Sequence, residues 1–196
     1  MKRETKQNTN LVTLGDPKSE PKHDTPKKGN IVLIGMPGAG KSTLGIVLAK
    51  MLTYDFCDTD LLIQRRCNDA LQHIIDTQGA QSFIDVENET LQELAVSNTL
   101  IATGGSAVYS HEGMLHLAKI ATIVYLHISY EEMLARIDNL HERGVVFRTD
   151  TKKDLRELYQ ERKHLYERYA DVTVDVDSLT ISDAANKVIA ALADNT

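Results

Sequence analysis

The sequence is poor in the features that mark extracellular and membrane proteins. It has only two cysteines, Cys57 and Cys67, no tryptophan and four prolines in 196 residues. Two cysteines without metal-ligand spacing are too few for a disulfide framework, so a reduced, cytoplasmic protein is expected. No apolar run approaches the roughly 18 residues that span a bilayer, and the N-terminus carries no apolar signal core. These absences predict a protein without a membrane partner.

Positive charge is scarce outside the first residues. The formal net charge is −6, from 22 Lys and Arg against 28 Asp and Glu. Residues 1–29 hold seven of the basic and four of the acidic residues, which leaves 15 against 24 in the rest of the chain. An acidic body lacks the clustered basic face that nucleic-acid binding needs, so no nucleic-acid partner is expected. Residues 1–28 are predicted to form a disordered basic tail, or alternatively a tether for an anionic partner.

What the chain does contain is an alternation of short apolar runs with longer helical segments. This alternation is typical of an α/β domain with a parallel sheet, and the length suits a single core. Strands are predicted at Asn30–Gly35, Tyr54–Asp58, Thr99–Thr103, Ala121–Ile128 and Asp171–Val176. Helices are predicted at Ser42–Leu52, Leu61–Thr77 with a break near residues 67–69, Gln81–Val96, Tyr130–Asn139, Lys152–Tyr169 and Ser182–Ala193. The expected architecture is a three-layer α/β/α fold around a five-stranded parallel sheet.

The most specific motif is a glycine-rich segment between the first predicted strand and helix. The stretch GMPGAGKST, residues 35–43, fits G-x-x-x-x-G-K-[ST]. Glycines let backbone N–H groups fold around phosphate oxygens, the lysine reaches the β- and γ-phosphates, and the serine hydroxyl binds Mg²⁺. The alternative is a glycine-rich turn that binds nothing. The predicted ATP-binding residues here are Gly38, Ala39, Gly40, Lys41, Ser42 and Thr43, with Ser42 also a Mg²⁺ ligand.

Acidic residues and glycines follow two further predicted strands. Asp58-Thr59-Asp60 comes at the end of the second strand, and Gly104-Gly105 follows the third. Residues two apart in an extended chain point the same way, so both carboxylates can face the crevice where open α/β sheets bind ligands. One carboxylate could organise Mg²⁺ and the other accept a proton; the alternative is a helix cap and a solvated acid. The two glycines would allow close backbone approach to a ligand, or would simply end the strand.

Taken in order, the stretches GMPGAGKSTLG, DTD and ATGGSAV resemble the shikimate kinase family, a branch of the small P-loop kinases that phosphorylate metabolites. The resemblance extends from residue 30 to the C-terminus and implies a P-loop NTPase fold of the nucleoside monophosphate kinase type. It implies that Asp60 binds the shikimate hydroxyls and acts as base or orienting group, and that Asp58 lies near Mg²⁺. It also implies that Gly104 and Gly105 supply backbone contacts to the acceptor.

Three arginines extend this resemblance. Arg143 resembles the family's lid arginine, which offsets the charge of the transferring phosphoryl group. Arg136 resembles the adenine-stacking arginine, and Arg162 resembles the arginine of an R-x-x-L-Y segment that grips the substrate carboxylate. Each could instead be a solvated surface charge. Residues 139–151, which lack periodicity, are predicted to form a lid within a P-loop kinase domain that spans residues 29–196.

One departure from the family pattern removes a charge, whereas Ser106 in place of a third glycine and Gly144 after Arg143 do not. The family has a second carboxylate-binding arginine directly after a phenylalanine, whereas this sequence has Ile84 after Phe83. Loss of a guanidinium removes a charge-assisted contact worth about 1.5 to 3 kcal/mol. Either Arg65, Arg66 or Arg162 compensates, or the site prefers a less anionic acceptor.

Other chemistry-bearing residues form no cluster in the sequence. Seven histidines are scattered without zinc-ligand spacing, and no G-x-S-x-G hydrolase elbow is present. Tyr125, Tyr159, Tyr166 and Tyr169 are expected in the core or on helix faces rather than as base-stacking platforms.

The sequence thus predicts a monomeric kinase that uses ATP and Mg²⁺ to phosphorylate a hydroxyl of a small metabolite, with shikimate the first candidate on resemblance. Two alternatives stay open: a kinase of a different small hydroxylated metabolite, and a non-catalytic ATP-binding regulatory protein. The predicted catalytic residues are Lys41, Asp60 and Arg143; Arg136 joins the ATP-binding set; the predicted substrate-binding residues are Asp60, Gly104, Gly105 and Arg162; and the predicted metal ligands are Ser42 and Asp58.

Overall fold

A parallel sheet organises the part of the chain that the computed structural model describes, residues 29–137 and 152–195. It has five strands in the order β2-β3-β1-β4-β5, and every neighbouring pair is parallel. The strands are β1 (Asn30–Gly35), β2 (Asp55–Asp58), β3 (Thr99–Ala102), β4 (Ala121–His127) and β5 (Val172–Asp175). All five strands predicted from the sequence are present, and their ends agree to within about one residue.

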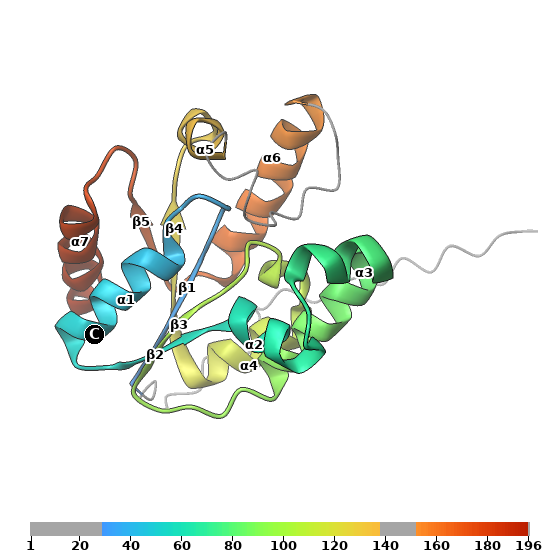
Figure 1. The fold of residues 1–196 in the computed structure, drawn as a ribbon. Coiled ribbons are helices and arrows are strands. Elements are labelled where there is room, and N and C mark those ends of the chain that lie inside the picture. Colours follow the sequence, from blue (N-terminus) through green and yellow to red (C-terminus); the bar gives the residue numbers. More distant parts are fainter. Residues whose placement is uncertain (1–28, 138–151, 196) are drawn as a thin grey trace, which may run out of the picture.

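Helices cover both faces of the sheet. They are α1 (Lys41–Leu52), α2 (Thr59–Cys67), α3 (Leu71–Gln92), α4 (His111–Ile120), α5 (Tyr130–Ile137), α6 (Lys152–Tyr169) and α7 (Ile181–Asp194), with a short 3₁₀ helix, η1 (Ala107–Tyr109). Figure 1 shows α1 and α7 on one face and α4 and α6 on the other, with α2 and α3 on the same side as α4. The predicted three-layer α/β/α architecture is therefore confirmed.

The central strands are mostly apolar because helices cover them from both sides. Every residue of β1 and β3 is buried. A second, smaller cluster of Ile63, Ile74 and Phe83 packs α2 against α3. This cluster holds α3 close to the point where the chain leaves β2.

The helices agree with the sequence-based prediction except for one that it lacked. The predicted break near residues 67–69 is confirmed, because Asn68 ends α2 in the left-handed conformation at φ 51°. The helices predicted on either side of residue 79 are also present, as the two arms of α3, which is kinked at Gly79 with φ 84°. Helix α4 was not predicted, because its ten residues bury only Gly113, Met114 and Leu117, too short a run for helical periodicity to register.

The carboxyl ends of β1, β2 and β3 meet at one edge of the sheet. The register pairs Leu33 with Ala102 and Ala102 with Asp58. The chain that leaves β2 therefore runs beside the chain that leaves β3, and the glycine-rich loop follows β1 at the same edge. Ligands of open α/β sheets bind at this edge, so the fold brings the predicted site segments together there.

Some predictions lie outside the described residues: the tail of residues 1–28, the lid of residues 139–151, and Arg143 within that lid. Of the helices that the structure describes, none combines the length and the apolar character needed to cross a membrane. The monomeric state, the cytoplasmic location and the absence of a nucleic-acid partner stay predictions.

Candidate active site

The loop between β1 and α1 is shaped to present backbone N–H groups. Gly38 and Gly40 have φ values of 82° and 86°, a left-handed conformation that strains any residue with a side chain. No side chain caps α1 at Gly40, so the first turn of the helix keeps N–H groups that an anion can accept from. Ser42 and Thr43 are exposed on this turn, and Ala39 is buried behind it. The predicted phosphate-binding residues thus form one continuous segment that ends on the uncapped first turn of α1.

Lys41 begins α1, and its side chain lies over this loop. Its Nζ donates hydrogen bonds to the carbonyl oxygens of Gly35 at 2.7 Å and Met36 at 3.0 Å. Burial lowers the pKa of Lys41 to about 8, while the nearby Asp60 carboxylate opposes part of that fall. The ammonium group therefore lies between the phosphate loop and the acidic side of the site.

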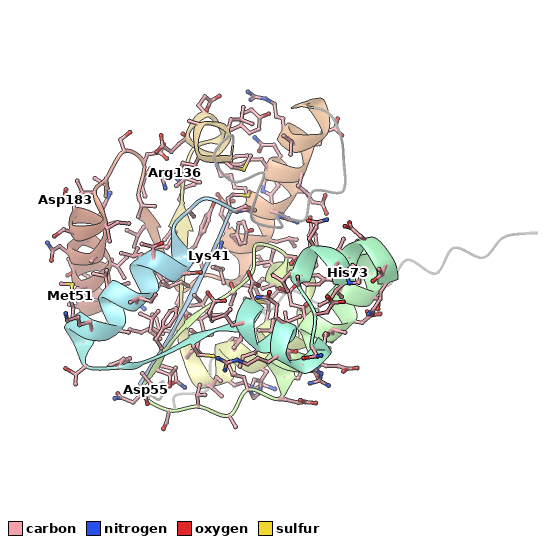
Figure 2. All side chains as sticks on the ribbon, viewed as in Figure 1. Lys41, Met51, Asp55, His73, Arg136 and Asp183 are labelled. Atoms are coloured by element: carbon pink, nitrogen blue, oxygen red, sulfur yellow. The ribbon has the colours of Figure 1, made fainter. Side chains whose placement is uncertain are left out.

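Arg136, on α5, reaches the same loop from above in the view of Figure 2. Its Nη1 donates to the Gly38 carbonyl oxygen at 3.0 Å, and its Nε and Nη2 bind the Glu132 carboxylate at 2.8 and 2.7 Å. The structure thus brings Arg136 beside the glycine-rich loop, and its contact with adenine stays a prediction.

Asp58 and Asp60 differ in their surroundings although they lie two residues apart. Asp58 caps α2, because its Oδ1 accepts a hydrogen bond from the Asp60 backbone N–H at 3.0 Å. Asp60 Oδ1 is buried and has no hydrogen-bond partner in the described part of the chain. Burial raises the pKa of Asp60 to about 6, Asp58 adds to the rise, and Lys41 opposes it. A carboxyl that ionises near neutral pH is suited to accept a proton.

The glycines after β3 lie where three charged side chains converge. A Cβ at Gly104 would lie 2.7 Å from Asp60 Oδ1 and 2.8 Å from Glu87 Oε1. A Cβ at Gly105 would lie 2.9 Å from Pro37 Cδ and 3.4 Å from Arg162 Nη1. Only residues without a side chain let this loop pass between the acids, the arginine and the phosphate loop.

Arg162 reaches this point from α6 and is only 2% exposed. Its Nε donates to the Tyr109 hydroxyl at 3.4 Å, and its guanidinium carbon lies 5.3 Å from the centre of the Tyr109 ring. One turn further along α6, the Tyr166 hydroxyl donates to the Gly105 carbonyl oxygen at 2.6 Å. Helix α6 therefore supplies a cation to the site and also holds the glycine loop.

The two other arginines considered as replacements for the missing one lie elsewhere. Arg66 forms ion pairs with Glu89 at 2.9 Å and with Glu93 at 2.6 Å, on the exposed side of α3. Arg65 is exposed on α2. Of these candidates, Arg162 is the one whose guanidinium contacts the acceptor side.

Glu87 has no role in the sequence-based prediction, yet it is fully buried in this site. Burial raises the pKa of Glu87 to about 8, and Ser106, Arg162 and Lys41 oppose the rise only in part. A signal for it exists, since Phe83, Glu87, Thr90 and Leu91 follow the helical period and are all buried. A charged residue on such a face is a candidate for function. Tyr109 and Tyr166 gave no comparable signal, because aromatic residues are ordinary in a core.

The arrangement therefore joins an anion-binding loop to a carboxylate that can take a proton. Two cations, Lys41 and Arg162, lie among three acids, Asp58, Asp60 and Glu87. The charges of Arg162 and of the three acids all act on the Lys41 ammonium group. Such a site can hold a phosphate chain against an alcohol and an acceptor anion together.

Comparisons with known proteins identify the family to which this chain is similar. The family model described as Shikimate kinase matches residues 37–193. Shikimate kinase of Francisella tularensis subsp. holarctica is 35% identical over 169 residues, which cover 85% of this chain and 96% of that relative. Shikimate kinase 1 of Pectobacterium atrosepticum is 36% identical over 171 residues, which cover 86% and 99%. The solved structure of shikimate kinase from Acinetobacter baumannii in complex with shikimate matches with a TM-score of 0.79 at 29% identity, covering 86% of this chain and 95% of that one.

Proposed function

The chain belongs to the shikimate kinase family, and on that premise we propose that it transfers the γ-phosphoryl group of ATP to a hydroxyl of shikimate. The reaction belongs to aromatic amino acid biosynthesis. The observation that carries the proposal is the convergence of Asp60, Gly104 and Arg162 beside the phosphate loop and its lysine. A donor site and an acceptor site thus share one edge of the sheet.

On the donor side, the backbone does most of the binding. The N–H groups of residues 38–43 and the N-terminus of α1 bind the phosphates, and Lys41 exchanges its two carbonyl partners for phosphate oxygens. Arg136 lies against the Gly38 carbonyl, where it can pack on the adenine ring. The uncapped helix N-terminus fits a polyanion, which supports this assignment.

A divalent cation fits the remaining oxygens of the donor side. The described residues hold no group of three or more His, Cys, Asp or Glu side chains that could bind a metal. Mg²⁺ needs no such group, because it takes one or two protein ligands together with phosphates and water. The exposed Ser42 hydroxyl and the Asp58 carboxylate are the residues that would hold it. When bound, Mg²⁺ neutralises charge on the β- and γ-phosphates.

On the acceptor side, Asp60 aligns the acceptor hydroxyl and takes its proton. The oxygen then forms a bond to the γ-phosphorus while the bond from that phosphorus to the bridging oxygen breaks, and ADP leaves. Arg162 binds the acceptor carboxylate, and the Gly104-Gly105 backbone lies against the acceptor ring. Arg143, outside the described residues, is assigned to charge balance on the transferring group, as is Lys41.

A second acceptor is favoured by one observation. Ile84 is half-buried on α3 and lies one turn before Glu87, which places an apolar side chain where the family resemblance has an arginine. A less anionic hydroxylated metabolite would need only one cation, Arg162. This candidate differs from the first in the acceptor alone.

The test is ADP release by the full chain with ATP, Mg²⁺ and a panel of hydroxylated acceptors that includes shikimate. Shikimate should give the highest kcat/KM, and Asp60→Asn should lower it by about 10² to 10⁴-fold while leaving ATP binding intact. Turnover of another acceptor without turnover of shikimate would establish the second candidate. Shikimate turnover that Asp60→Asn leaves unchanged would remove Asp60 from its assigned role.

A further inference from the structure

Glu87 is a buried acid that has no assigned role in the reaction described above. Its side chain is 0% exposed, and neither carboxylate oxygen has a well-formed hydrogen bond within the described residues. A Cβ at Gly104 would lie 2.8 Å from Glu87 Oε1 and 2.7 Å from Asp60 Oδ1, so the two carboxyl groups meet at this glycine. A buried polar atom without a partner is costly, so an unpartnered acid in a binding site calls for a cause.

The groups around Glu87 come from every side of the site. Asp60 of α2 disfavours its ionised form, whereas Arg162 of α6, Lys41 of α1 and the Ser106 hydroxyl favour it. Tyr166 of α6 also faces it, because the Glu87 charge acts on that phenol.

The helices on the far sides of α3 bring no counter-ion to Glu87. Helix α4 presents Gly113 against Leu91 and Asn88 of α3, which are uncharged. Arg66 of α2 is already paired with Glu89 and Glu93 on the exposed side of α3. Within the described residues, the cations that act on Glu87 are Lys41 and Arg162, and Lys41 also responds to Asp58 and Asp60.

Charge balance then depends on whether Glu87 is ionised. With all three acids ionised, Asp58, Asp60 and Glu87 outnumber Lys41 and Arg162, and an anionic acceptor would add one more negative charge. Like charges gathered in one buried site repel one another. A proton on Glu87 removes one of them. Burial raises the pKa of this carboxyl to about 8, so the neutral form prevails at physiological pH.

Ile84 explains why the proton is needed in this chain. It precedes Glu87 by one helical turn on the same face of α3, and it is apolar where the family resemblance places a guanidinium. A cation at that position would balance an ionised Glu87. An isoleucine leaves the proton as the means of neutralising it.

We propose that Glu87 is a positioning residue that keeps its proton in the acceptor complex, so that the acceptor anion binds only to the form of the protein in which this carboxyl is neutral. The inference rests on the proposed function for the identity of the acceptor. Acceptor binding is then coupled to proton uptake above the pH at which Glu87 ionises. The affinity for shikimate falls about tenfold for each further pH unit.

The experiment measures the Kd of shikimate for the full chain by calorimetry between about pH 6 and 9.5, in two buffers of different ionisation enthalpy. Glu87→Gln copies the neutral carboxyl in shape and charge. It should flatten the rise in Kd above about pH 8 and reduce proton uptake by up to one per shikimate. Lys41 also titrates near pH 8 and responds to the Glu87 charge, so the same comparison is repeated with Lys41→Met in both proteins, where the remaining difference reports Glu87. Glu89→Gln, an exposed acid on the same helix, should match the wild type.

Ile84→Arg tests the same claim with Glu87 intact. At about pH 9 this variant should bind shikimate at least about tenfold more tightly than the wild type, with a smaller gain at about pH 6.5. An equal gain at both pH values would overturn the proposal, as would a wild-type pH slope in Glu87→Gln. Weaker binding by Glu87→Gln at every pH would also overturn it. Absence of shikimate binding by the wild type at any pH is a different result, which removes the proposed acceptor and this inference with it.

Discussion

The two halves of the active site use glycine for opposite reasons. In the phosphate loop, Gly38 and Gly40 have positive φ, and a Cβ at Gly40 would meet nothing within 4 Å. In the acceptor loop, Gly104 and Gly105 are not among the described glycines with positive φ, but a Cβ on either would collide with its neighbours. The first loop needs a backbone conformation, whereas the second needs space.

This difference follows from what each half binds with. The phosphate half is one continuous segment whose backbone N–H groups form the binding surface. The acceptor half gathers charged side chains from α1, α2, α3 and α6, and their charges contribute to the shifted pKa values of Lys41, Asp60 and Glu87. Substitutions in the acceptor half should therefore act selectively on shikimate and should not be additive, because the charges there depend on one another.

Lys41 belongs to both halves, and its removal should have the largest effect. It lies on the phosphate loop, and its pKa responds to Asp60, Arg162, Asp58 and Glu87. Lys41→Met keeps the buried aliphatic stem and removes the charge, so kcat/KM for both substrates should fall by about 10³-fold or more. Steady-state kinetics with each substrate varied would measure this, with thermal unfolding as the control for folding. If only the kcat/KM for ATP fell, Lys41 would belong to the phosphate half alone.

Arg162→Lys tests whether the acceptor half recognises an anion by geometry as well as by charge. Lysine keeps the charge but cannot reproduce the planar guanidinium that lies over the Tyr109 ring. The KM for shikimate should rise about 10 to 100-fold, while the KM for ATP stays within about twofold. Arg66→Lys, at an exposed pair, is the matched control and should change neither constant. A rise in the KM for ATP as large as that for shikimate would contradict the division into halves.

The same contrast explains what the sequence could predict. The phosphate loop is a local feature, so residues 35–43 with their flanking strand and helix identify it, and the alternation of strands and helices fixes the three-layer fold. The acceptor half is assembled through the topology. Arg162 contacts Tyr109, which lies 53 residues away in the sequence, and no motif spacing predicts that contact.

The missed elements have related causes. Helix α4 is short and carries Gly113 at its closest approach to Leu91, so neither its length nor its composition marks it as a helix. Glu87 lies on a buried face of α3, where the family resemblance drew attention to the neighbouring Ile84 instead. The roles of Asp60, Arg136 and Arg162 came from resemblance, and the structure adds the contacts that surround them.

Gly104→Ala sharpens the contrast between the two kinds of glycine. Alanine is conformationally acceptable where φ is not positive, so the expected effect comes from the clash with Asp60 and Glu87 alone. The KM for shikimate should rise about tenfold, with little change in the KM for ATP. Gly40→Ala should do the reverse and weaken ATP binding, because it strains the loop at φ 86° without any clash. Steady-state kinetics on the two variants would check this. If each variant changed the KM for ATP and the KM for shikimate equally, the two loops would not differ in the way described.

Tyr166→Phe should have the smallest effect and the most specific one. The variant removes only the hydroxyl that donates to the Gly105 carbonyl at 2.6 Å, and the ring keeps its stacking on Tyr125 at 5.1 Å. One hydrogen bond of this kind is worth about 1 kcal/mol, so a looser glycine loop should raise the KM for shikimate about three- to fivefold.

Tyr159→Phe is its matched control, because the Tyr159 hydroxyl makes an equivalent bond to the Ile128 carbonyl at 2.8 Å, away from the acceptor loop. Both variants should lose similar stability in thermal unfolding, but only Tyr166→Phe should change the KM for shikimate. Equal shifts in both would mean that the hydroxyl acts on the stability of α6 as a whole. A shift in Tyr166→Phe alone would show that α6 positions the acceptor loop through the backbone of one glycine, so that the acceptor half also depends on a main-chain contact.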